Sequence, residues 1–108
     1  MAFTPYHNIT GSTGVDIELI ALGTNINEIK SILITNTHAT ADATITLFIE
    51  DNPTAAAASI FKILNTVAIP ADTSLILDNS SIISFDNSIY SLYMTVGSSD
   101  TLDVLINI

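Results

Sequence analysis

The sequence predicts an all-β protein, built as a single antiparallel β-sandwich or jelly-roll-like domain of seven or eight strands. Apolar and polar residues alternate in short runs along most of the 108 residues, as in strands with one buried face. Clusters of Asn, Asp, Ser and Gly separate these runs at intervals of about 8 to 15 residues, as in sandwiches and barrels. No run has a convincing helical period, so no helical layer is expected.

The first clear strand is expected at residues 15–22, where apolar side chains alternate with Asp16 and Glu18. The run SILITNTHATADATITLFIED then predicts two strands, at 28–35 and 43–50, on either side of the polar connection NTHATAD. The length of this connection is close to that of a hairpin loop. The two strands are therefore expected to be antiparallel neighbours in one sheet.

The second half of the chain supplies the remaining strands. Pro53 lacks the N–H group that a strand ladder needs, so residues 51–59 are expected to form a loop. Polar turn residues then delimit five strand-like segments, at 60–69, 74–78, 82–85, 88–96 and 101–108. Isoleucine, valine and threonine are frequent in these segments, as the pleated surface of a sheet favours.

The first 14 residues are expected to form a flexible arm, and residues 15–108 the sandwich domain. The segment MAFTPYHNITGSTG has no regular alternation, and it contains Gly11 and Gly14 as expected hinges. Alone it cannot bury enough apolar surface to offset an ordering cost of roughly 1–2 kcal/mol per residue. It nevertheless carries large apolar groups among polar residues. We expect the arm to clasp a neighbouring subunit through Phe3, Pro5 and Tyr6.

The composition excludes several classes of partner. Eleven acidic residues stand against two basic ones, Lys30 and Lys62, and the formal net charge is −9. That charge repels phosphate backbones and anionic lipids, so no nucleic-acid or membrane partner is expected. The mean hydropathy is +0.53, yet no apolar run approaches the roughly 20 residues of a membrane helix. The first residues resemble no secretory signal, so the chain is expected to be made in the cytoplasm without being exported.

The scarcity of charge indicates self-association. Charged residues make up 12% of the chain, about half the usual share, and the strands expected at 28–36 and 43–50 carry apolar residues on both faces. A surface coated in Ser, Thr and Asn is one explanation. Strand faces covered by other subunits are the explanation we favour, so a homo-oligomer or a lattice subunit is expected.

No residue set indicates catalysis. The chain has no cysteine, no nucleophile elbow and no glycine-rich phosphate loop. Its two histidines, His7 and His38, do not share a metal-ligand spacing and are expected to be exposed. The sequence therefore predicts a protein that is not an enzyme and has no cofactor.

Three strand ends carry an Asp followed by an Asn, at residues 51–52, 78–79 and 86–87. Oxygen ligands from three converging loops are suited to binding Ca²⁺. The same dipeptide is ordinary turn chemistry, in which the side chain accepts a nearby backbone N–H. Because no Asp-x-Asp-x-Asp loop is present, turns are the preferred interpretation and no metal site is predicted.

Two tyrosines are candidates for a stacking platform. Tyr90 and Tyr93 are an odd number of residues apart, so in a regular strand they face opposite sides. Tyr90 shares its face with Leu92 and Met94 and is expected in the core. Tyr93 is expected to be exposed.

Three segments share a pattern beyond simple alternation: Ile34–Ile49, Ile69–Leu77 with IPADTSLIL, and the closing pair Asn87–Ile106. Together they resemble small structural proteins of tailed bacteriophages. The resemblance covers residues 28–108 and departs from the pattern at Asn87 and in the alanine-rich loop 54–59. It implies a virion component without enzymatic activity, assembled in several copies with itself and with other virion proteins.

The sequence thus predicts a structural protein of a phage virion, either a capsid-decorating subunit or a neck or tail accessory subunit. Its partners would be further copies of itself and the major capsid or tail and neck proteins. The alternative is a carbohydrate- or receptor-binding module of a fibre or adhesin. Such a module needs an aromatic platform or a calcium cluster, and the chain has four Phe, three Tyr and no Trp.

Overall fold

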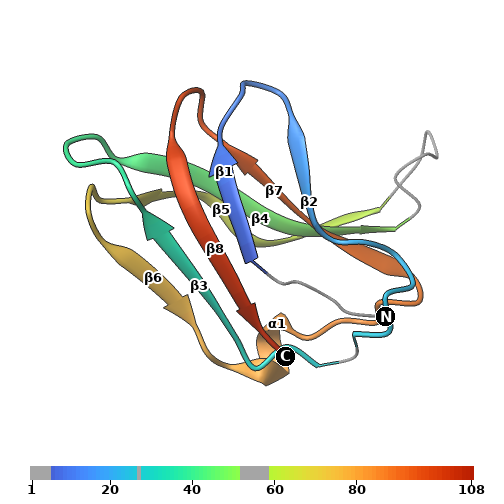
Figure 1. Cartoon of the computed structure of the whole chain (residues 1–108). Coiled ribbons are helices and arrows are strands. Elements are labelled where there is room, and N and C mark those ends of the chain that lie inside the picture. The colour runs from blue at the N-terminus through green and yellow to red at the C-terminus, as the bar shows by residue number, and fades with distance from the viewer. Residues whose placement is uncertain (1–5, 27, 52–58) are drawn as a thin grey trace.

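Two four-stranded antiparallel sheets face each other in the computed structural model, which describes residues 6–26, 28–51 and 59–108 (Figure 1). The elements are β1 (Tyr6–Thr10), β2 (Asp16–Ile20), β3 (Ser31–Asn36), β4 (Ala43–Asp51), β5 (Ile60–Ile69), β6 (Ser74–Leu77), α1 (Ser80–Ile83), β7 (Tyr90–Val96) and β8 (Thr101–Asn107). Sheet A has the strand order β1-β8-β3-β6, and sheet B the order β2-β7-β4-β5. The predicted all-β sandwich of seven or eight strands is confirmed, and the described residues form eight.

The chain follows the path of a jelly roll. The first four strands pair with the last four in reverse order, as β4–β5, β3–β6, β2–β7 and β1–β8, and every pair is antiparallel. Successive pairs alternate between sheet B and sheet A. The chain therefore runs as one long hairpin that is rolled around a single core.

The hairpin expected over residues 28–50 is wrong. β3 belongs to sheet A and β4 to sheet B, so the connection between them crosses the sandwich. Asn36, at the end of β3, is buried, and its Nδ2 donates to the carbonyl oxygens of Ala41 at 2.9 Å and Ile69 at 3.0 Å. These bonds join the end of β3 to the β3–β4 connection and to β5 of sheet B. Alternation did not reveal this, because two half-buried strands bury their apolar faces equally well across a core.

Part of the expected N-terminal arm is a strand of the sandwich. β1 pairs with β8 over five register pairs, and its Ile9 is buried in the core. His7 reaches across to sheet B, where its Nε2 lies 3.1 Å from the carbonyl oxygen of Leu19. The sandwich therefore includes residues before Val15, which corrects the boundary expected after residue 14. One buried apolar side chain is too few to produce a visible alternation in the sequence.

A short helix stands where a strand was expected at residues 82–85. α1 begins after Asn79, whose side chain accepts the N–H of Ser81 at 3.1 Å and so caps the helix. Ile83 is buried at the α1 end of the sandwich, while Ile82 points outward and is exposed. The polar run that ends β6 is thus a helix start, and the two isoleucines fall on different sides of one turn.

The core lies between the inner faces of the two sheets. Its fully buried side chains include Ile32, Ile34, Leu47, Leu92, Met94, Val104 and Ile106. A bulge in β2 between Glu18 and Ile20 turns both Leu19 and Ile20 inward. The bulge breaks the strict alternation that the sequence predicted for residues 15–22. Val15, which precedes β2, is 49% exposed and lies outside the core.

Asn87 is a buried polar group that joins two parts of the chain. Its Oδ1 accepts the N–H of Ile26 at 3.2 Å, and its Nδ2 donates to the carbonyl oxygens of Ala21 at 3.0 Å and Tyr90 at 3.1 Å. These bonds fix the segment after β2 to the start of β7. Their partners are backbone atoms, so a change of neighbouring side chains leaves them intact.

Candidate interaction surface

A row of large apolar side chains crosses the outer face of sheet A, one from each strand. Tyr6 of β1 pairs with Leu105 of β8. Leu105 pairs with Leu33 of β3, which pairs with Ile76 of β6. The residues on either side of Leu33 and Leu105 are buried in the core, so these two project outward, and paired residues project to the same side. We call these four residues the apolar row.

The apolar row is accessible in the single chain. Tyr6 is 65% exposed, Ile76 61% and Leu105 40%. An antiparallel sheet commonly keeps its solvent face polar, and single exposed apolar residues are normal on any surface. Four apolar residues aligned across every strand of one sheet form a continuous stripe, which is typical of a surface that a partner covers.

Polar residues flank the apolar row on both sides. The first flank lies two residues from the row along each strand, on the same face. It consists of Asn8, Asp103, Thr35 and Ser74. The second flank contains Ser31 and Asn107, which pair with each other. In the first flank Asn8 Nδ2 donates to Asp103 Oδ1 at 2.6 Å, and the hydroxyls of Thr35 and Ser74 lie 2.9 Å apart. These contacts hold the first flank in a fixed arrangement.

Two shallow hollows lie beside the apolar row. One, of about 290 Å³, is lined by Tyr6, Leu33 and Leu105 together with the second flank. The other, of about 190 Å³, lies between Tyr6 and Leu105 on one side and the first flank on the other. Each hollow has room for one or two side chains of a partner.

The residues proposed as an assembly arm are only partly described. Phe3 and Pro5 lie outside the described residues, so the structure does not test their predicted role. Tyr6 is the first residue of β1 and one end of the apolar row. The structure therefore places Tyr6 on a sheet face of its own chain, and joins it to three residues that the sequence analysis did not single out.

Both histidines make hydrogen-bonding contacts within the chain. His38 Nδ1 accepts the N–H groups of Thr40 at 3.1 Å and Ala41 at 3.0 Å, in the connection between β3 and β4. His7 contacts Leu19 across the two sheets, as described above. The two rings lie on separate segments, and neither approaches a carboxylate in the contacts found among the described residues.

The acidic strand ends make local hydrogen bonds. Asp51 Oδ1 accepts the N–H of Ser59 at 2.6 Å, and Asp86 Oδ1 accepts that of Ser88 at 3.0 Å. The hydrogen bonds from Ser88 lower the pKa of Asp86 below its ordinary value. Within the described residues, no group of three or more Asp, Glu or His side chains is arranged to hold a metal ion.

The aromatic side chains of sheet B are engaged with one another. Tyr93 stacks on Phe48 with ring centroids 5.8 Å apart, and its hydroxyl donates to Glu18 Oε2 at 3.2 Å. Burial raises the pKa of Tyr93 and the nearby carboxylate of Glu18 raises it further. Tyr90, expected in the core, is half-buried and meets Phe61 edge to face at 5.9 Å. Each of these tyrosines therefore contacts another aromatic ring of the same sheet.

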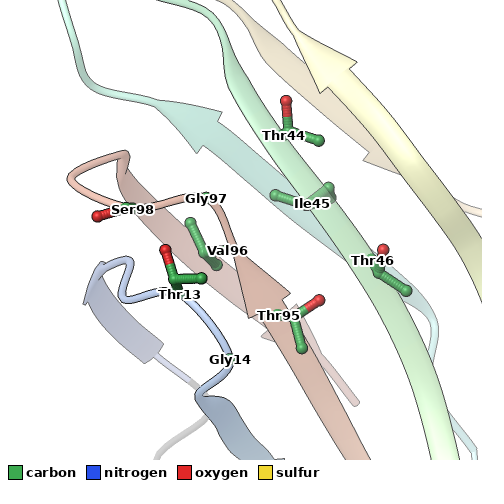
Figure 2. Close-up of a pocket in the computed structure, with 9 residues that line it drawn as sticks. All are labelled: Thr13, Gly14, Thr44, Ile45, Thr46, Thr95, Val96, Gly97 and Ser98. Carbon is green, nitrogen blue, oxygen red and sulfur yellow. The ribbon is translucent and has the colours of Figure 1, made fainter.

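A groove of about 240 Å³ opens at one end of sheet B (Figure 2). Figure 2 shows Thr13 and Gly14, from the loop after β1, beside the end of β7 with Val96 and Gly97. The rest of its lining is Thr44, Ile45, Thr46, Thr95 and Ser98. These side chains carry hydroxyl and methyl groups but no acid, base or aromatic ring. The groove therefore has no group to transfer a proton and no platform for a sugar.

A third hollow, of about 250 Å³, lies where α1 meets the edge strands β5 and β6. Its lining is mainly isoleucine and leucine, with Asp78 and Asn79 at the rim. The exposed Ile76 belongs both to this hollow and to the apolar row. The apolar surface thus continues from the face of sheet A over its β6 edge.

Comparison with protein-family models, with curated proteins and with solved structures finds no match to this chain. The argument for function therefore depends on its own residues. No helix among the described residues is long and apolar enough to cross a membrane.

Proposed function

We propose that this chain is a non-enzymatic structural subunit of a tailed-bacteriophage virion. It assembles in several copies, as a capsid-decorating subunit or as an accessory subunit of the neck or tail. The observation that carries the proposal is the apolar row, because a stripe of four large apolar residues, three of them exposed, gains free energy when a partner covers it.

Three further observations support the proposal. The jelly roll is a common architecture of viral capsid domains, although lectins also use it, so this support is an analogy of fold alone. The resemblance of residues 28–108 to phage structural proteins points the same way. The low share of charged residues agrees with a subunit whose surface is partly covered by neighbours.

A carbohydrate-binding role has less support. The groove at the end of sheet B has no aromatic lining, and Tyr93 is stacked on Phe48. Asp51 and Asp86 accept the N–H groups of Ser59 and Ser88, and the Asn79 side chain accepts that of Ser81. Among the described residues, the groove thus lacks an aromatic lining and the acidic side chains form no group of three that could hold Ca²⁺.

The test is to purify phage particles from cells that produce this chain and to analyse them by mass spectrometry and electron cryo-microscopy. We expect the chain at a fixed copy number, in density that fits the jelly roll with the face of sheet A against a neighbour. A chain that is abundant in the lysate but absent from purified particles would contradict the proposal. Specific glycan binding by the purified protein would favour the alternative.

A further inference from the structure

We infer that a second copy of this chain covers the apolar row, with the two sheets A packed face to face around a two-fold axis that runs along the row. This inference deepens the proposed function and rests on it, because it names the partner of the same surface. In this pairing Tyr6 meets Tyr6 and Leu105 meets Leu105, and each strand lies over its own copy in the partner, running in the opposite direction.

The two flanks carry the argument for self-pairing. A two-fold axis along the apolar row brings the first flank of one copy over the second flank of the other. Asp103 then lies over Asn107 of the second copy, because the two residues are equally far from Leu105 along β8. An amide that faces a carboxylate donates a hydrogen bond to it, so the acidic group is not left unpaired in the interface.

The polar residues of the neighbouring strand, β3, are complementary as well. Thr35 lies over Ser31 of the second copy, and each hydroxyl can donate or accept. The face is therefore complementary to itself in a chain whose net charge of −9 otherwise opposes self-association.

The other face-to-face arrangement is less favourable. A two-fold axis parallel to the strands also stacks apolar residues, with Leu105 over Leu33. In that arrangement Asp103 of each copy lies over Thr35 of the other copy, so the two Asp103 side chains are on adjacent strands at the same distance from the row. Two like charges so placed in a desolvated interface repel each other. The axis along the row keeps them on opposite flanks, four residues apart along β8, which is about 13 Å of strand.

The size of the face predicts a weak contact. Four strands at about 4.8 Å spacing and five residues at about 3.3 Å give a footprint of roughly 19 by 16 Å. That is well below the roughly 800 Å² per partner of a standard stable interface. The pairing is therefore expected only at high protein concentration, or where an assembly brings two copies together.

The absence of native cysteine allows a direct test with single-cysteine variants. We would mix Thr35→Cys with Ser31→Cys at high protein concentration and treat the mixture with a short bifunctional maleimide. We expect a cross-linked dimer from the mixture and little from either variant alone. Leu105→Cys alone should cross-link, and Thr44→Cys, exposed on the outer face of sheet B, is the matched control that should not.

The outcomes separate this inference from the proposed function. Efficient dimer formation by Thr35→Cys alone would overturn the axis that we infer, and the absence of any cross-link from the mixture would overturn the pairing. When Leu105→Asp is added to both cysteine variants, their mixture should no longer cross-link. Ile89→Asp, which changes an exposed isoleucine outside the row, should leave the cross-linking of the mixture unchanged. A chain found in particles but without cross-linking would contradict this inference and leave the virion role standing. Cross-linking of a chain that is absent from particles would support the pairing and contradict the virion role.

Discussion

Gly11 lies directly against the backbone carbonyl of Gly97, and a side chain at Gly11 would collide with it. The N–H of Gly11 donates to the carbonyl of Asp100 at 2.8 Å, and its carbonyl accepts the N–H of Ser99 at 3.0 Å. The loop after β1 is thus fixed to the turn between β7 and β8. The hinge expected at Gly11 is wrong, because the glycine is required for close packing and not for flexibility.

Gly11→Ala is therefore expected to destabilise the fold. Gly11 does not have a positive φ, so with free space alanine would stabilise by about 0.4–1 kcal/mol by restricting the unfolded chain. The collision with Gly97 predicts the opposite sign, a loss of about 1–3 kcal/mol in the free energy of unfolding. Urea denaturation measures the difference. A stabilised Gly11→Ala variant would show that the loop has room to move.

Asn87 and Asn79 both follow an Asp, yet their replacement is expected to have unequal effects. Asn87→Ala removes three hydrogen bonds and leaves the N–H of Ile26 buried without its partner, which should cost at least about 2 kcal/mol. Asn79→Ala removes one exposed helix cap and should cost about 1 kcal/mol. Thermal unfolding of both variants checks the order. Equal losses would mean that the Asn87 contacts contribute little.

Most strands of this fold were predictable from the sequence, but which strands pair with one another was not. Alternation located β4, β5, β7 and β8 within a few residues, because it records only which face of a strand is buried. It does not record which strand lies alongside, so β3 and β4 were paired wrongly. It also missed β1, where Ile9 is the one buried apolar residue.

The same limit applies to the candidate surface. The sequence shows that Leu33 and Leu105 stand among polar residues on their strands' outer faces, but 72 positions separate them. Only the register of β3 against β8 aligns them, and only that of β1 and β6 adds Tyr6 and Ile76. An interaction stripe built across strands leaves no local signature, because each strand contributes a single residue.

Tyr93 is expected to make stability fall at high pH. Its pKa is raised in the folded protein above the ordinary value of 10.0, first by burial and then by Glu18. The folded state therefore holds this proton more tightly than the unfolded state. The stabilisation of the folded state by the protonated Tyr93 is complete below pH 10, and it is lost as the pH rises through the raised pKa.

Tyr93→Phe provides the control for that prediction. The variant should lose less stability than the wild type between pH 10 and higher pH, because it has no phenol to ionise beside Glu18. Denaturation midpoints at several pH values measure this difference. A spectrophotometric titration should also lack the late phenolate component in the variant. Identical pH dependence of the two proteins would contradict the assignment.

Removal of divalent metal is expected to leave the fold unchanged. Asp51 and Asp86 accept backbone N–H groups of their own turns, and Asn79 caps α1, so these oxygens already stabilise the strand ends. The measurement is the melting temperature with and without a chelator, and with added Ca²⁺. A fall of many degrees after chelation would show that these loops converge on an ion.

The last prediction concerns the N-terminal segment, which the structure divides into two parts. If all of residues 1–14 were a flexible arm, deletion of residues 2–12 would leave the sandwich folded. β1 changes that expectation, because its removal exposes the edge of β8 and takes Ile9 out of the core. Loss of a buried isoleucine alone costs roughly 2–5 kcal/mol when it is replaced by alanine. A chain that lacks residues 2–10 should therefore be strongly destabilised or fail to fold.

Deletion of residues 2–5 is the matched experiment. It removes Phe3 and Pro5 but retains all five register pairs between β1 and β8, so the melting temperature should remain within a few degrees of the wild type. If Phe3 and Pro5 clasp a neighbouring subunit, this shorter deletion lowers the number of copies in purified particles while the protein stays folded. If the shortened chain reaches the wild-type number of copies in particles, the prediction that Phe3 and Pro5 bind a neighbouring subunit is wrong. It would also leave Tyr6, which this deletion keeps, as the part of the segment that acts in assembly through the apolar row.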